Sequence, residues 1–116
     1  MSPKRLGRVA PPSVNDEWHV RFGTTEAAKG WDDLCAHATV KTREAFELMR
    51  SNPRPPPDQS HYQLKGSLAF RSYGGKLLEQ WQVKVGGSAR IWYLPDDDVG
   101  TVWVVLASAK QPKETE

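Results

Sequence analysis

Cationic and flat aromatic side chains gather in the second half of the sequence, and together these residue types can bind RNA. Phosphate groups require positive charge at several points, and the unstacked bases of single-stranded RNA rest on flat side chains. The cationic residues of this region are Lys65, Arg71, Lys76, Lys84, Arg90, Lys110 and Lys113, and they are accompanied by Tyr73, Trp92 and Tyr93. Composition alone favours a simpler interpretation, an ordinary basic surface above an aromatic core.

The sequence lacks the motifs of common cofactor and metal sites. It contains no Walker loop, GxGxxG or HExxH motif and no Cys/His set with metal-ligand spacing, so we expect neither a cofactor nor a metal. The acidic run 96–98 is interpreted as a solvated turn, because adjacent carboxylates in a hairpin point apart. His61 follows a proline-rich loop and could act as an acid or base near neutral pH, although an exposed loop position is the simpler interpretation.

The totals are those of one small domain. The chain has 116 residues, a formal net charge of +2 and a single cysteine, Cys35. This length suits one hydrophobic core, and so small a net charge does not by itself indicate a nucleic-acid-binding protein. Cys35 is interpreted as a buried helix residue. The longest apolar run, 102–107, is too short to cross a bilayer, so we expect a cytoplasmic protein that does not associate with a membrane.

Hydrophobic periodicity predicts an α+β fold with an N-terminal strand, a helical hairpin and a C-terminal antiparallel sheet. Thr24 or Thr25 is expected to cap a first helix near Glu26, Gly30 weakens that helix slightly, and Thr39 is a plausible cap for the second. The expected segments are a strand at 17–23, helices from 26 and at 40–50, an extended stretch at 61–66, and strands at 77–85, 89–94 and 101–109.

The predicted strands have two unlike faces. Trp81, Val83 and Val85 share one face, and Gln80, Gln82 and Lys84 share the other, so we expect the helices to cover the first and to leave the polar one available. Alternation alone does not assign the faces of the last two strands. Residues 1–16, which contain Pro, Gly and unbalanced basic residues, are predicted to form a flexible basic arm before a folded domain at 17–113 and a tail at 114–116.

This order of elements, together with several short motifs, resembles the RelE/ParE superfamily of bacterial toxins. The motifs are "LKG" at 64–66, "WQVKV" at 81–85, "RIWY" at 90–93 and the short basic end "KQPK" at 110–113. The resemblance covers residues 17–113. It implies a toxin of a type II toxin-antitoxin system, held inactive by a separate antitoxin protein.

The RelE branch of this superfamily implies a metal-independent endoribonuclease that cuts mRNA on the ribosome, in which the 2′-hydroxyl attacks the adjacent phosphate. By position, the resemblance implies catalytic roles for Lys84, Arg90 and Lys110. The neighbouring cations Lys65, Arg71, Lys76 and Lys113 are predicted to bind RNA phosphates, and Trp92, which shares the face of Arg90, is predicted to stack on a base.

The sequence departs from the family pattern at its end, where no Tyr or His follows Ala109. The acid or base would then be Lys84, Lys110, Lys113, His61 or Tyr73. Two other interpretations stay open: a ParE-like toxin that binds DNA gyrase without cutting RNA, and a toxin-like module without activity.

Overall fold

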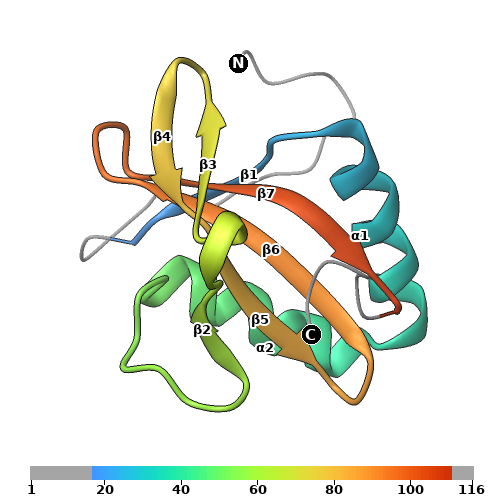
Figure 1. Ribbon diagram of the computed structural model, residues 1–116. Coiled ribbons are helices and arrows are strands. Elements are labelled where there is room, and N and C mark those ends of the chain that lie inside the picture. The colour runs from blue at the N-terminus through green and yellow to red at the C-terminus, as the bar shows by residue number, and fades with distance from the viewer. Residues whose placement is uncertain (1–16, 111–116) are drawn as a thin grey trace.

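The computed structural model describes residues 17–110, which form two helices on one face of a five-stranded sheet (Figure 1). The predicted arm 1–16, Lys113 and the predicted tail lie outside the described residues. The elements are β1 (His19–Phe22), α1 (Thr25–His37), α2 (Thr39–Ser51), β2 (His61–Gln63), β3 (Phe70–Tyr73), β4 (Lys76–Glu79), β5 (Trp81–Val85), β6 (Ala89–Asp96) and β7 (Thr101–Ser108), with a 3-10 turn at Gly66–Leu68. The expected α+β order is confirmed. No helix of residues 17–110 is long and apolar enough to cross a membrane.

The main sheet has the strand order β1-β7-β6-β5-β2, in which β1 runs parallel to β7 and the other neighbours are antiparallel. The strand expected at 77–85 is divided at Gln80. The Gln80 backbone and side-chain amides donate to Ala69 O and Leu68 O at 2.8 Å each. This break lets β4 pair with β3 in a separate hairpin, whose turn residues Gly74 and Gly75 have the positive φ angles (59° and 82°) that a two-residue turn requires.

The first helix is anchored to the sheet through its predicted cap. The Thr24 hydroxyl accepts a hydrogen bond from Ala27 N and donates one to Val105 O, both at 3.0 Å. The predicted cap of α2 is wrong: Thr39 is the first residue of α2, and its hydroxyl donates to Cys35 O. The expectation that Cys35 is buried is also wrong, since this side of α1 faces solvent.

The core lies between the helices and the sheet. The predicted face of β5, formed by Trp81, Val83 and Val85, is buried against the helices. The structure also resolves the faces that alternation left open. Ile91, Tyr93, Val102 and Val104 face the helices, whereas Trp92, Leu94 and Val105 form a smaller cluster on the opposite side.

The β3–β4 hairpin covers only part of that opposite side. Tyr73 and Leu78 of the hairpin pack on the smaller cluster. A β-bulge widens the surface beneath, because Tyr93 pairs with Val104 and Trp92 pairs with Leu106, which leaves Val105 as an extra residue in β7. We call the part of this sheet surface near the β5–β6 turn the open face; it is formed by Tyr62, Gln82, Lys84, Arg90, Trp92 and Ser108.

In the acidic run at the β6–β7 turn, Asp97 and Asp98 are exposed as expected, whereas Asp96 is buried. Asp96 is 4% exposed, and both of its oxygens accept hydrogen bonds from Lys76 Nζ, at 2.9 and 3.0 Å. Burial raises the pKa of Asp96, but the bonds from Lys76 and from the Trp103 indole outweigh it, so the net pKa is lowered. Asp97 accepts from Arg54, and Asp98 lies 3.3 Å from Lys76 Nζ. These carboxylates tie the hairpin and the 52–60 loop to the end of the sheet.

Candidate functional site

A row of three polar side chains crosses the open face. Lys84 of β5 lies directly opposite Arg90 of β6, and Arg90 lies directly opposite Ser108 of β7. Paired residues in an antiparallel sheet project from the same face, so this register places the two predicted cations side by side. The row lies beside the β5–β6 turn, at the end of the sheet opposite the β6–β7 turn (Figure 1).

Arg90 has donors left over for a ligand. Its Nη1 donates to Gly87 O and Ala89 O, at 3.2 and 3.0 Å, which folds the guanidinium back over the β5–β6 turn. Its Nε is buried and has no hydrogen-bond partner within residues 17–110. A guanidinium carries five N–H donors and no acceptor, and leaving a buried donor unsatisfied is costly. Arg90 is 6% exposed, so an anion can reach this edge of its side chain only after the groups that cover the guanidinium move aside.

Lys84 adds a second positive charge to the row. Its Nζ lies 5.8 Å from the centroid of the Tyr62 ring, over which the ammonium is held by a cation-π contact. Neither Lys84 nor Arg90 forms an ion pair with a described residue. Two neighbouring cations without a carboxylate between them form a local positive potential.

The next row along the open face is a hydrogen-bonded chain of side chains. Trp92 Nε1 donates to Gln82 Oε1 at 2.8 Å, and Gln82 Nε2 donates to the Tyr62 hydroxyl at 2.7 Å. Gln82 is 0% exposed and Trp92 is 5% exposed. The Trp92 ring, predicted to stack on an RNA base, thus has little surface on which a base could stack in this structure.

Two of the other predicted residues lie close to the row. Lys110 is exposed and follows β7, where its backbone N–H donates to Ser108 Oγ at 3.1 Å. Arg71 of β3 is half-buried and lines a hollow together with Glu26, Leu106 and Ser108. Because Ser108 pairs with Arg90, this hollow adjoins the row directly.

Two further predicted residues lie elsewhere. Lys76 is bonded to Asp96, six positions along β6 from Arg90 and so about 20 Å away at the usual rise of a strand. Lys65 is exposed and precedes the 3-10 turn at the far end of β2 from Lys84. Lys113 is outside the described residues.

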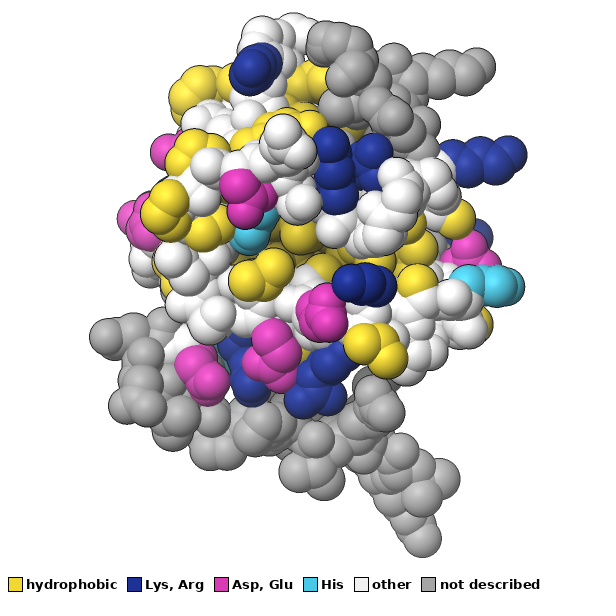
Figure 2. All heavy atoms as spheres, turned by 90° about the horizontal axis from the view of Figure 1, so that it is seen from below, with side chains coloured by type: hydrophobic (Ala, Val, Ile, Leu, Met, Phe, Trp, Pro, Cys, Tyr) yellow, Lys and Arg dark blue, Asp and Glu magenta, His cyan; other side chains and the backbone are white. Residues whose placement is uncertain are grey.

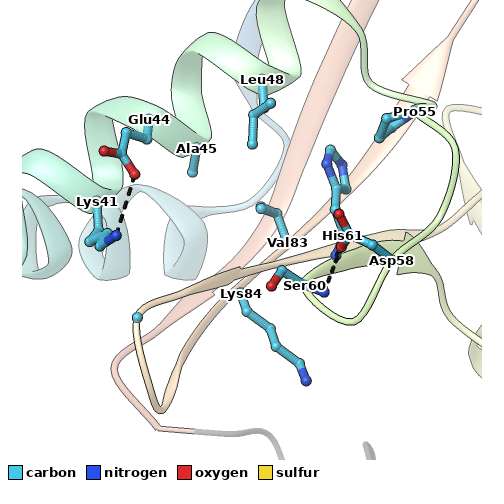
Figure 3. Close-up of a pocket in the computed structure, with 11 residues that line it drawn as sticks. Lys41, Glu44, Ala45, Leu48, Pro55, Asp58, Ser60, His61, Val83 and Lys84 are labelled. Atoms are coloured by element: carbon cyan, nitrogen blue, oxygen red, sulfur yellow. Dashed lines mark hydrogen bonds and ion pairs between the residues drawn. The ribbon is translucent and has the colours of Figure 1, made fainter.

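His61 is separated from the row by the sheet itself. It is 4% exposed in β2, so the expected exposed loop position is wrong. The Tyr93 hydroxyl donates to Pro53 O at 2.7 Å, so it must accept from His61 Nε2, with which it is in close contact. Burial lowers the pKa of His61, against a smaller upward effect of Asp58. Figure 3 shows the His61 ring and the Lys84 side chain pointing to opposite sides of the strands.

The hollow that His61 borders is also lined by Lys84, but its other charged side chains have partners. It lies between α2, β5 and the loop before β2, and Figure 2 shows acidic, basic and hydrophobic side chains mixed on this side of the molecule. Lys41 and Glu44 on its rim are 3.7 Å apart, and Asp58 Oδ1 accepts from the backbone N–H groups of Ser60 and His61 (Figure 3). We therefore place the candidate site on the open face.

Tyr73, another candidate acid or base, is also held away from the row. Its hydroxyl donates to Gly23 O at 3.3 Å, and its ring packs on Trp103 with 5.2 Å between centroids. The residue that sequence reasoning missed is Tyr62. Its position in the extended 61–66 stretch was visible, but its neighbours on β5 and β6 depend on strand pairing that no local pattern contains. Within residues 17–110, no group of three or more His, Cys, Asp or Glu side chains could hold a metal ion.

Comparison with known proteins gives one structural finding. No family model and no curated protein sequence matches the chain. A solved structure does match: the RelE-RelB complex of the archaeon Pyrococcus horikoshii OT3, with a TM-score of 0.57 and 11% sequence identity. The match covers 83% of this chain and 97% of that chain. At such low identity the likeness is one of fold, and the protein has a RelE-like α+β fold.

Proposed function

We propose that this protein is the toxin of a type II toxin-antitoxin pair and that it cleaves mRNA on the ribosome with the open face. The observation that supports this most directly is the buried Arg90 guanidinium, whose Nε has no partner among residues 17–110, placed opposite Lys84, which forms no ion pair with those residues. A phosphodiester would satisfy both groups. The RelE-like fold supplies the second line of support.

The proposed reaction needs little more than charge and proton transfer. The RNA 2′-hydroxyl attacks the adjacent phosphorus, the bond to the 5′-oxygen breaks, and a 2′,3′-cyclic phosphate and a 5′-hydroxyl result. Negative charge develops on the phosphorane, where fixed cations act most strongly. Arg90 and Lys84 would contact this group, while Lys110 and Arg71 would bind neighbouring phosphates along the strand.

A protein antitoxin is the proposed partner. The solved structure that this chain resembles is that of a RelE-RelB complex. For this chain, the simplest inhibitor would place a carboxylate where the phosphate binds, because a carboxylate also pairs with the fork of a guanidinium. We therefore expect RNA and antitoxin to compete for Arg90.

The test is primer extension on an abundant mRNA after brief induction of the wild-type chain and of Arg90→Gln. Gln preserves a donor for the carbonyls of the turn and removes the charge. Arg43→Ala is the matched control, because Arg43 is an exposed arginine of α2 whose side chain, within residues 17–110, bonds to Glu47 alone. New ends within translated codons should appear with the wild type and Arg43→Ala and vanish with Arg90→Gln. Growth arrest without new ends would instead indicate a gyrase-binding toxin, and neither effect would indicate an inactive module.

A further inference from the structure

The hydrogen bonds around Tyr62 determine where its phenol proton can go. The indole of Trp92 can only donate, so the Gln82 atom that faces it must be the amide oxygen. The Gln82 nitrogen then faces Tyr62 and donates to the phenol oxygen. Tyr62 therefore keeps its own O–H for another acceptor, and no described residue accepts it.

The position of this O–H is well defined. Gln82 is fully buried and is held at both ends of its amide, by Trp92 on β6 and by Tyr62 on β2. Tyr62 itself is half-buried, and its hydroxyl is anchored by the Gln82 amide. Such a buried amide, satisfied on both sides, restricts the rotamers of the side chains that it joins.

Tyr62 also lies beside the proposed phosphate site. The Lys84 ammonium is 5.8 Å from the centre of its ring, and Arg90 is directly opposite Lys84 in the sheet. Lys84 thus stands between the phenol and the guanidinium. A phosphate bound by Arg90 and Lys84 would have the Tyr62 hydroxyl at the side remote from Arg90.

We propose that Tyr62 is the general acid of the cleavage reaction, an inference that rests on the proposed function. The 2′-oxygen forms its bond to phosphorus and loses its proton to solvent water. The bond from phosphorus to the 5′-oxygen breaks, and the phenol of Tyr62 gives its proton to that oxygen. The phenolate is reprotonated from water. Gln82 and Trp92 are positioning residues that act through Tyr62.

The experiment compares two synthetic mRNAs in programmed ribosomes, cut by purified Tyr62→Phe and by the wild type. One mRNA is natural at the scissile linkage, and the other carries sulfur in place of the bridging 5′-oxygen. A thiolate leaves without being protonated, so a general acid is not needed for the second. Tyr62→Phe should cleave the natural mRNA about 100-fold or more slowly than the wild type, and the sulfur-bridged mRNA at the wild-type rate.

Two control variants make the outcomes distinct. Tyr73→Phe also removes one hydrogen-bonded phenol from the same side of the sheet and should cleave both mRNAs normally. Arg90→Gln should be slow on both, because charge on the phosphorane develops with either leaving group. Normal cleavage of the natural mRNA by Tyr62→Phe, or an equal loss on both mRNAs, would overturn the acid role while leaving the proposed function intact. Failure of the wild type to cleave either mRNA would overturn both.

Discussion

Replacing Gly30 by alanine tests how closely α1 lies against the sheet. A Cβ at this position would be 1.8 Å from Ala107 O and 2.8 Å from the Ala107 carbonyl carbon. Carbon-oxygen contacts in proteins are about 3.3 Å or longer, so the helix would have to retreat by roughly 1.5 Å. The obstacle is the backbone of β7, an inner strand of the sheet, which cannot rotate aside as a side chain can.

The expected loss of stability follows from two opposing effects. Alanine in a helix gains about 1 kcal/mol over glycine, whereas overpacking costs about 1–3 kcal/mol and most where the backbone must shift. We expect a net loss of about 2 kcal/mol, which for a domain of this size lowers the melting temperature by roughly 10 °C.

Thermal and urea unfolding, followed by tryptophan fluorescence, measure this difference. The control is Gly87→Ala, since a Cβ at Gly87 would have no heavy atom within 4 Å and the residue does not have positive φ; its stability should stay within about 0.5 kcal/mol of the wild type. Helix propensity taken alone predicts that Gly30→Ala is stabilising. A midpoint equal to or above that of the wild type would therefore refute the close packing described for α1 and β7.

Three further predictions concern two buried polar groups, Tyr93 and His61, and the partly exposed Glu79. Tyr93→Phe should lower the free energy of unfolding in urea by about 1–3 kcal/mol, because it leaves a loop carbonyl and His61 unpartnered; an unchanged midpoint would contradict this. Burial holds the pKa of His61 below 6.5, so the unfolded state takes up this proton more readily, and stability should be full above about pH 6.5 and fall as the pH is lowered. An NMR titration midpoint of His61 above 6.5 would reverse that sign. The bond from the Trp81 indole lowers the pKa of Glu79, so the contribution of Glu79 to stability is present above about pH 4.3 and lost on acidification. The free energy of unfolding of Glu79→Gln should therefore depend less on pH in this range than that of the wild type. Equal slopes for the two proteins would contradict this.

Local patterns in the sequence were sufficient for the elements and for one face of the sheet. The alternation of Trp81, Val83 and Val85 predicted the buried side of β5, and the hydroxyl of Thr24 predicted the start of α1. Both depend on neighbours within a few residues. For Gly30, helix propensity predicted only a slight weakening of α1. It did not predict that a side chain at this position would collide with the backbone of Ala107, which is far along the chain.

The candidate site was predictable only in part, because it depends on register. Lys84 and Arg90 are separated by a short turn, so their pairing follows from the β5–β6 hairpin. Tyr62 lies near them because β2 pairs with β5. The β3–β4 hairpin, which belongs to a separate sheet, lies between these two strands in the sequence, so no local pattern predicts their pairing. Lys76 was predicted to belong to the site because of its positive charge, but the structure places it beside Asp96 instead.

The most direct test of the proposed cleavage is to identify the ends that the purified protein leaves on a short synthetic mRNA in the A site of programmed ribosomes, without added metal beyond that which the ribosomes need. Mass spectrometry of the fragments should find a 2′,3′-cyclic phosphate on one side of the cut and a 5′-hydroxyl on the other, from the wild type and Arg43→Ala but not from Arg90→Gln. Intact mRNA with the wild type, or equal cleavage by Arg90→Gln, would contradict the proposal that the open face is a ribonuclease site.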